Sequence, residues 1–253
     1  PPRSTLFPYT TLFRSPVGRV AEIRQTLGGE HAPHVGDLLG GRFGLLPVVW
    51  VGLGLSLLQQ FVGINVIFYY GTALWQAVGV SEERSLFINV ITGLVNIGST
   101  LIAIALIDRA GRRPLLLAGS AGMLVSLAVV AWAFSRAVPD ANGLPGFPDP
   151  ATARAALIAA YVYVLFFGFS WGPVVWVLLG EMFNNRIRAS ALALAAAVQW
   201  IANFVVSTTF PPLSRSLGLA GCYALYAAFA GLSLVFVWGV VRETRGRTLE
   251  EMK

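Results

Sequence analysis

The chain has 253 residues, of which 56% are apolar and only 12% are charged. This charged share is about half of that in an ordinary soluble domain, so the composition excludes a water-exposed globule and favours a protein embedded in a bilayer. The net charge of +6 does not indicate nucleic-acid binding, because the basic residues form no stripe that alternates with aromatic residues. The single cysteine, Cys222, excludes an intrachain disulfide and a multi-cysteine metal site.

Residues 1–44 are too polar to span a bilayer. Residues 4–7 and 10–15 form a near-repeat, STLF and TTLFRS, that is typical of a translated sequencing adapter. We therefore expect residues 1–15 to be non-native, with the natural chain starting further upstream, and residues 16–44 to form a cytoplasmic segment with short helices. His31 and His34 lie in this segment, but two histidines without further ligands do not predict a metal site. No metal and no other cofactor is expected.

Six apolar runs follow, each long enough to cross the hydrocarbon core, which takes about 20 residues of helix. They cover residues 46–75, 86–107, 114–135, 155–179, 190–210 and 219–241. Helices are expected because backbone groups in lipid must find hydrogen-bond partners within their own segment. The chain is therefore predicted to be an all-α integral membrane protein, with six transmembrane helices over residues 45–241 and a cytoplasmic tail over residues 242–253.

The basic residues predict the orientation of these helices, because cytoplasmic loops carry an excess of Arg and Lys. The side that includes both chain ends carries most of them, whereas the other side carries only Arg84, Arg136, Arg154 and Arg215. Both ends are therefore expected in the cytoplasm, with the turn-rich loop 138–152 outside. Lys253 is the only lysine; this preference for Arg is typical of GC-rich genomes and favours a bacterial inner membrane.

Four of the six runs carry polar residues on one face, and such residues need partners at depth in a membrane. The first run holds, around Gly63, the residues Gln59, Gln60, Asn65, Tyr69 and Tyr70. The second holds a stripe on one helical face that consists of Asn89, Thr92, Asn96 and Ser99. The fourth includes Pro173, which removes a backbone donor and predicts a break or kink. The fifth holds, beside Trp200, the residues Gln199, Asn203 and Ser207.

Two interpretations of these polar faces remain open. The amides can hydrogen-bond helix to helix, at about 0.6 kcal/mol each, or they can line a binding cavity. A cavity is favoured because helices interrupted at membrane depth tend to line one. No Asp, Glu, Lys, Arg or His lies in the middle of a run. Amides can both donate hydrogen bonds to hydroxyl groups and accept hydrogen bonds from them. Trp and Tyr rings match the apolar face of a sugar, so a neutral sugar fits this set of residues best. The runs contain no nucleophile–base pair and no carboxylate pair, so they do not predict an enzyme.

Five motifs resemble those of the sugar porters of the major facilitator superfamily, and they occur in the same order. They are QQFVGINVIFYY (59–70), DRAGRR (108–113), SWGPVVWVLLGEMF (170–183), QWIANF (199–204) and RETRGRTLEE (242–251). The resemblance implies a twelve-helix fold of two six-helix halves with sugar bound between them. The present helices would form the C-terminal half. Their partners would be a missing N-terminal six-helix half, a monosaccharide substrate and the lipid bilayer, without nucleic acid.

The resemblance also implies site residues. Sugar contacts fall on Gln59, Gln60, Asn65, Asn96, Trp176 and Gln199, and the same pocket is lined by Tyr69, Tyr70, Gly172 and Trp200. Asn203 is added from its helical stripe alone. A cytoplasmic gate of salt bridges is implied for Asp108, Arg112, Glu181, Arg188 and Glu243; the alternative, solvated charges that only set the topology, leaves the acidic residues unexplained. Departures from the family pattern occur near this gate, at Asn184, Arg186 and Arg242.

The predicted function is transport of a neutral monosaccharide, a pentose or a hexose, by alternating access. Proton coupling is expected in the complete protein, and the resemblance places the coupling carboxylate in the missing half, because these runs hold no titratable group at depth. Facilitated diffusion stays open. Two alternatives from other classes are a six-helix sugar-binding sensor and a homodimeric half-transporter.

Overall fold

The computed structural model describes residues 34–40, 44–76, 79–139 and 145–244. Residues 1–15, most of the segment 16–44 with His31, and most of the tail 242–253 lie outside the described residues, so the expectations for them remain predictions. The described chain is helical apart from a short antiparallel hairpin of β1 (Val138–Pro139) and β2 (Pro145–Gly146). The helices are η2 (Val35–Leu38), α2 (Pro47–Phe61), α3 (Ile64–Gln76), α4 (Glu82–Ala110), α5 (Arg112–Ser135), α6 (Pro150–Phe169), α7 (Pro173–Met182) and α8 (Arg188–Val240).

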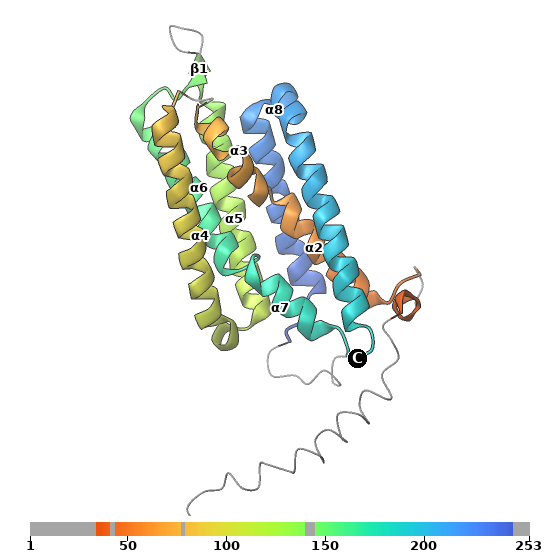
Figure 1. Ribbon diagram of the computed structural model, residues 1–253. Coiled ribbons are helices and arrows are strands. Elements are labelled where there is room, and N and C mark those ends of the chain that lie inside the picture. The colour runs from red at the N-terminus through yellow and green to blue at the C-terminus, as the bar shows by residue number, and fades with distance from the viewer. Residues whose placement is uncertain (1–33, 41–43, 77–78, 140–144, 245–253) are drawn as a thin grey trace, which may run out of the picture.

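Five described segments are long and apolar enough to cross a membrane: Pro47–Gln76, Glu82–Ala110, Arg112–Ser135, Pro150–Met182 and Arg188–Val240. The all-helical class is confirmed, but the predicted count of six separate spans is not. The fifth and sixth runs both lie in α8, which has 53 residues and would be about 80 Å long if it were straight. It is not straight, because Gly218 has non-helical angles (φ 70, ψ 172). Figure 1 shows the two arms of α8 side by side and joined at the top.

The first run is interrupted at Gly63, between α2 and α3. Gly63 has a φ of +83, which favours glycine, and a Cβ added there would lie 2.7 Å from the ring of Tyr226. The carbonyl of Val62 accepts a hydrogen bond of 2.8 Å from the buried hydroxyl of Tyr163 in α6. The interruption thus exposes no unpaired carbonyl at Val62, as a bend at membrane depth requires.

The fourth run is interrupted at the position that Pro173 predicts. α6 ends at Phe169 and α7 begins at Pro173, which has no N–H to continue the helical hydrogen bonds. In the connection between them, the Trp171 side chain is fully buried. Its indole nitrogen donates to the carbonyl of Leu116 and to the hydroxyl of Ser120, both in α5. The connection is therefore attached to α5.

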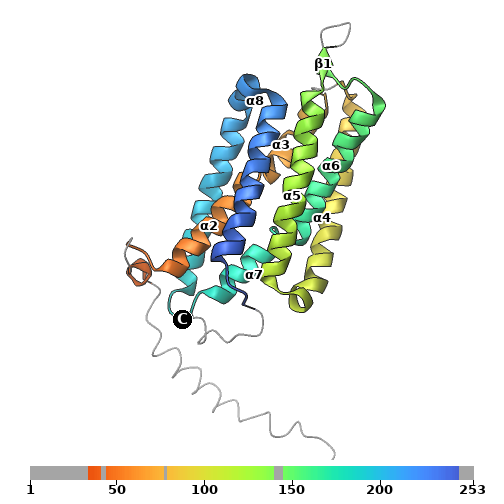
Figure 2. The same ribbon diagram turned by 180° about the vertical axis from the view of Figure 1, so that it is seen from behind.

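α5 is the central helix of the bundle, packed against α6 and α8 as Figures 1 and 2 show. Small residues bring α5 and α6 close together: a Cβ added at Gly122 would lie 2.2 Å from the ring of Phe166. Leu116, Met123 and Leu127 of α5 are fully buried. α4 packs on α6 and α3, and large apolar side chains on its far face remain exposed, among them Leu94, Ile97 and Leu101.

The two ends of the bundle carry different elements. The α4–α5 connection, the end of α7 and both ends of α8 lie together at the bottom of Figure 1, whereas the β1–β2 hairpin lies at the top. The bottom therefore holds the basic cluster Arg109, Arg112, Arg113, Arg186 and Arg188. This two-sided distribution is the one that the basic residues of the sequence predict.

Candidate functional site

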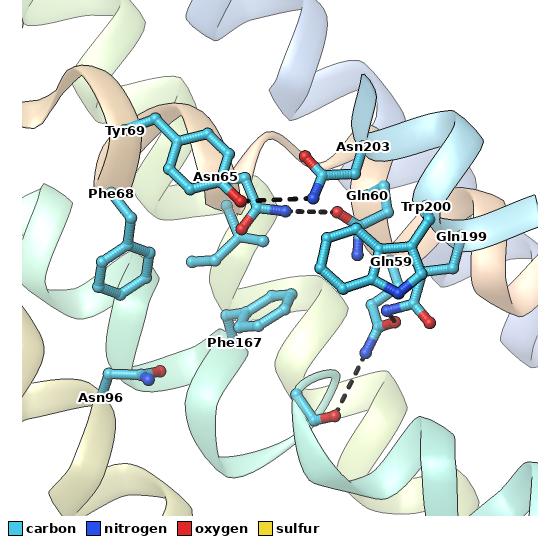
Figure 3. Close-up of a pocket in the computed structure, with 12 residues that line it drawn as sticks. Gln59, Gln60, Asn65, Phe68, Tyr69, Asn96, Phe167, Gln199, Trp200 and Asn203 are labelled. Atoms are coloured by element: carbon cyan, nitrogen blue, oxygen red, sulfur yellow. Dashed lines mark hydrogen bonds between the residues drawn. The ribbon is translucent and has the colours of Figure 1, made fainter. Parts of the chain in front are cut away.

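A cavity of about 490 Å³ lies where the two interrupted segments face α8. Its lining is made of Gln59, Gln60, Ile64, Asn65, Phe68, Tyr69, Asn96, Phe167, Gly172, Gln199, Trp200 and Asn203. Figure 3 shows their side chains converging from α2, α3, α4, α6 and α8. Tyr69 and Trp200 are 56% and 67% exposed, so the cavity is open beside them. None of the lining residues is Asp, Glu, Lys, Arg or His.

The structure brings all but two of the predicted binding residues to this cavity, and the exceptions are Tyr70 and Trp176. Tyr70 turns toward α8, where its hydroxyl donates to the Ser207 carbonyl at 3.0 Å and its ring packs on Phe210. Trp176 lies beyond the cavity on α7 and is 39% exposed. Neither residue lines the cavity of this half, so their contact with the sugar stays a prediction.

Sequence reasoning missed three apolar lining residues, Ile64, Phe68 and Phe167. Ile64 and Phe68 precede Asn65 and Tyr69 directly and repeat with the same spacing of four residues, so they share one face of α3. This periodicity could have identified them. Phe167 sits one turn before the interruption at Pro173, and no local signal in α6 distinguishes it from the other aromatic residues there.

The polar stripe of the second run divides between two roles. Asn96 lines the cavity. Asn89 instead packs on α3, since a Cβ added at Gly71 would lie 2.2 Å from its Oδ1. Ser99 packs in the same way on α6, since a Cβ at Gly168 would lie 1.9 Å from its Oγ. These two residues therefore pack against neighbouring helices, and the Ser99 hydroxyl donates to the Asn96 carbonyl of its own helix.

The deepest amides form a directed chain of hydrogen bonds. Gln59 Nε2 donates to the carbonyl of Trp171 at 2.6 Å and to that of Gly172 at 3.2 Å. Gln199 Nε2 donates to Gln59 Oε1 at 2.5 Å. The remaining oxygen, Gln199 Oε1, is buried without a hydrogen-bond partner among the described residues. An unpaired buried acceptor is costly, so this oxygen is a strained point of the chain of amides.

A second group of amides lies nearer the opening. Asn65 Nδ2 donates to Gln60 Oε1 at 2.5 Å, and Ser207 Oγ donates to Asn203 Oδ1 at 3.0 Å. Asn203 Nδ2 lies 3.5 Å from the Tyr69 hydroxyl, at the outer limit of a hydrogen bond. The Asn65–Gln60 contact leaves Asn65 Oδ1 and Gln60 Nε2 for a ligand, whereas Asn203 uses both of its polar atoms. Figure 3 shows the Asn65–Gln60 and Asn203–Tyr69 pairs in the cavity lining.

The cavity has the chemistry of a binding site for a neutral polyhydroxylated molecule. Amides supply both donors and acceptors, while Trp200, Tyr69 and Phe68 supply flat apolar surfaces. Within the described residues, no group of three or more His, Cys, Asp or Glu is arranged to hold a metal ion.

A separate charged cluster occupies the end of the bundle that carries the basic residues. Arg112 binds Glu181 through two nitrogens, with Nη2 to Oε1 at 2.6 Å and Nε to Oε2 at 3.0 Å. Its Nη2 also lies 3.0 Å from Asp108 Oδ1. Glu243 accepts from the backbone N–H groups of Arg112 and Arg113 at 3.0 and 2.9 Å, at the start of α5, where the helix dipole favours a carboxylate. Three helices, α4, α5 and α7, and the segment that follows α8 are thereby connected at one point.

Arg188 lies outside this charged cluster. Its Nε donates to the Phe183 carbonyl at 3.2 Å, and among the described residues it takes part in no ion pair. The contribution of Arg188 to a gate of salt bridges therefore stays a prediction. Arg186, one of the departures from the family pattern, pairs instead with Asp37 of η2 at 2.8 Å. The positions of both side chains depend on the shape of the α7–α8 connection, which residue spacing does not define.

Comparison with known proteins identifies the family. The family described as "Sugar (and other) transporter" matches residues 14–253. The chain belongs to this sugar transporter family. A glucose transport protein of Synechocystis sp. is 57% identical over 234 residues, which are 92% of this chain and 50% of the relative. The D-xylose-proton symporter of Escherichia coli strain K12 is 38% identical over 233 residues, which are 88% of this chain and 45% of the relative.

Solved structures of sugar transporters have the same fold. The inward-open conformation of the xylose transporter from E. coli matches with a TM-score of 0.72 and 36% identity, over 93% of this chain and 45% of that one. A bromodeoxyglucose complex of a proton:xylose symporter of the major facilitator superfamily also matches with a TM-score of 0.72. The helical bundle is thus that of a major facilitator superfamily sugar porter. The chain spans about half the length of the curated relatives it matches.

Proposed function

We propose that this chain is half of a carrier that moves a neutral monosaccharide across a bacterial inner membrane by alternating access. The observation that carries the proposal is the cavity, where amides and aromatic rings without a charged side chain gather beside two helix interruptions. Its volume of about 490 Å³ lies within the range of roughly 300–1,000 Å³ for small-molecule sites. Membership of the sugar transporter family supports the substrate class.

D-glucose is the substrate to test first, and D-xylose the second. The relative at 57% identity is named a glucose transport protein, and the one at 38% is named a D-xylose-proton symporter. In the proposed complex, Gln60 Nε2 donates to a sugar hydroxyl and the Trp200 ring covers an apolar face of the sugar, while Gln59 and Gln199 line the same cavity. Asn65, Asn96 and Asn203 complete the polar contacts. Trp176 stays a predicted contact from the family resemblance alone.

We place six crossings in this half, because α8 crosses twice by turning at Gly218. Both chain ends then lie on the cytoplasmic side with the charged cluster. The exposed apolar faces of α4 and of the first arm of α8, which carry residues such as Ile97 and Phe204, face the second six-helix half or lipid. Transporters with a site of this kind work by rocking of one six-helix half against the other, so the working carrier contains both halves.

The charged cluster is proposed as the cytoplasmic gate. Arg112, Asp108, Glu181 and Glu243 connect α4, α5, α7 and the end of α8, and charge-assisted bidentate bonds are the strong ones. Holding these ends together closes the inner side of the carrier while the outer side is open. Breaking them allows the ends to separate when the sugar is released inward.

Proton coupling is proposed for the complete carrier, with the coupling carboxylate in the other half. The cavity lining of this half contains no carboxylate or histidine, and coupling needs a titratable group at depth. The relatives include both a D-xylose-proton symporter and a glucose facilitated diffusion protein of Zymomonas mobilis. A protonophore separates these mechanisms, since it abolishes accumulation of sugar against a gradient only in a symporter.

The experiment that tests the function measures uptake of radiolabelled D-glucose and D-xylose by the complete carrier in proteoliposomes. We expect saturable uptake that unlabelled sugar competes away and that an anionic sugar phosphate of similar size does not. Saturable binding without net flux would indicate a sensor. Uptake by this chain alone, as a dimer, would indicate a homodimeric half-transporter.

A further inference from the structure

We propose that Thr244 is a positioning residue of the charged cluster, and that its hydroxyl holds Glu181 in the orientation that Arg112 binds. The inference rests on the proposed function, since it concerns the proposed gate. Thr244 follows α8, in a strap that consists of residues 241–244, and it is only 6% exposed. It carries no charge and belongs to no ion pair, yet it is attached to the centre of the cluster.

Glu181 is bound from two directions. The Thr244 hydroxyl donates to Glu181 Oε2 at 2.6 Å. Arg112 occupies an edge of the same carboxylate, with Nη2 2.6 Å from Oε1 and Nε 3.0 Å from Oε2. The terminal torsion of a Glu side chain has a broad minimum, so a second partner from another segment restricts the plane of the carboxylate. Thr244 therefore favours the orientation in which both oxygens face the guanidinium.

Both partners of this ion pair lie at helix ends that disfavour their charge. Glu181 is in the last turn of α7, and Arg112 is the first residue of α5. The helix dipole favours a carboxylate at the N-terminal end and a cation at the C-terminal end, which is the opposite of this arrangement. Neither charge is stabilised by its own helix, so the position of each depends on contacts with other segments. For Glu181, the Thr244 hydroxyl is such a contact.

The strap bridges α5 and α7 through two consecutive residues. Glu243 accepts from the backbone N–H groups at the start of α5, and Thr244 donates to Glu181 of α7. Val241 is 5% exposed and Thr244 is 6% exposed, so the strap is packed on the bundle at both ends. The end of α8 lies near both helices at the bottom of Figure 2. Separation of α7 from α5 must therefore break a bond of the strap as well as the ion pair.

The test begins with Thr244→Val, which removes the hydroxyl and keeps the branched shape of the side chain. In the complete carrier we expect the maximal rate of D-glucose uptake to fall by roughly threefold, the net size of one hydrogen bond. KM should stay nearly unchanged, because the strap does not line the cavity. Thr244→Ser keeps the hydroxyl and should restore the rate. An unchanged rate in a folded Thr244→Val carrier, or no restoration by Thr244→Ser, would overturn the proposal.

A double mutant separates positioning from a general loss of stability. If Thr244 acts through the bond between Glu181 and Arg112, Thr244→Val should cause no further loss of rate in an Arg112→Ala background, since residues of one network are not additive. The same factor in both backgrounds would overturn the proposal. Ser126→Ala is the matched control: Ser126 is also buried, and its hydroxyl donates to carbonyls of its own helix, α5. It should leave the rate and KM unchanged.

Hydrogen exchange at the start of α5 tests the strap itself, and Thr244→Ala replaces Thr244→Val if the latter does not fold. The N–H groups of Arg112 and Arg113 donate to Glu243, so their protection should fall when the Thr244 hydroxyl is lost and stay normal in Thr244→Ser. Unchanged protection would overturn the positioning role, while sugar uptake by the unaltered carrier would leave the proposed function intact. Absence of saturable sugar uptake by the unaltered carrier would instead overturn the proposed function, and this inference with it.

Discussion

At the scale of single residues, the cavity presents amides that are fixed on one side and free on the other. Gln60 is an example: its oxygen accepts from Asn65, and its nitrogen forms no hydrogen bond with the described residues. Fixing one side reduces the conformational freedom that the side chain loses when a sugar binds. The free donors and acceptors then act as a preformed complement to the hydroxyl groups of the ring.

Replacing Gln60 should weaken sugar binding without affecting the fold. In Gln60→Ala, Asn65 loses its partner and the sugar loses a donor, so we expect KM for D-glucose to rise by roughly tenfold or more. The measurement is initial uptake at several sugar concentrations, with the amount of protein in the membrane determined in parallel. Tyr70→Phe is the control, because Tyr70 does not line the cavity. Equal KM values for the two variants would contradict the placement of Gln60.

Arg112 provides a test of the gate. Arg112→Ala removes a bidentate bond to Glu181 and a contact to Asp108, and such charged bonds are worth about 1.5–3 kcal/mol each. The transport rate should fall by roughly tenfold as the closed inner side becomes less populated, while the sugar affinity changes little.

Arg188→Ala is the comparison for this gate prediction. Arg188 contacts only the Phe183 carbonyl among the described residues, so its loss should affect the rate less than the loss of Arg112. A change of affinity at constant rate in Arg112→Ala would show that the cluster is not a gate.

At the scale of elements, the interruption at Gly63 is supported from two sides, by Tyr163 at the Val62 carbonyl and by the ring of Tyr226. Gly63→Ala should destabilise the protein, because its φ of +83 disfavours a side chain and its Cβ would overlap Tyr226. Gly239→Ala adds the same methyl group to open space in α8 and should be neutral. Thermal unfolding of both variants in detergent checks this; equal midpoints would contradict it.

The first turn of α6 depends on Asp149. Its carboxylate accepts from the backbone N–H groups of Thr152 and Ala151 and from the Thr152 hydroxyl, and these bonds lower the pKa of Asp149. The stabilisation is therefore complete above the unfolded pKa of about 3.9 and is lost as the pH falls through the lower, folded value.

Hydrogen exchange in the first turn of α6 tests this assignment. The protection factor, which is corrected for the pH dependence of intrinsic exchange, should be equal at pH 7 and pH 5, lower in Asp149→Ala, and nearly normal in Asp149→Asn, since Asn is an equally good N-cap. Loss of protection between pH 7 and pH 5 would contradict the assignment.

A feature of these elements could be predicted from the sequence where a single residue determines it, and not where it depends on a neighbouring helix. Pro173 interrupts its helix because it lacks an N–H, which is a property of the residue itself, so the interruption was predictable. The roles of Asn89 and Ser99 depend on the small residues Gly71 and Gly168 of neighbouring helices, and helical periodicity cannot distinguish a face toward a cavity from a face toward a neighbour. Trp171 likewise attaches the connection between α6 and α7 to α5 only because Ser120 of α5 lies within 2.9 Å of its indole nitrogen.

At the scale of the whole molecule, the ends of the helices divide into two sides, and the single cysteine makes this testable. Cys222 is buried, and Cys222→Ala provides a cysteine-free background. In that background, a cysteine at Arg154 should react with a membrane-impermeant maleimide in intact cells. A cysteine at Arg242 should react only after permeabilisation, because it lies on the opposite side. The reverse pattern would invert the proposed orientation.

The absence of charged residues from the cavity lining also determines how this half responds to voltage. Moving one elementary charge through the full membrane potential is worth about 2.3 kcal/mol per 100 mV, but a neutral lining around a neutral sugar carries no such charge. Rocking of this half is therefore electrically silent at its centre. A dependence of the transport rate on membrane potential would therefore arise outside this lining, from the other half or from the charged cluster at the helix ends.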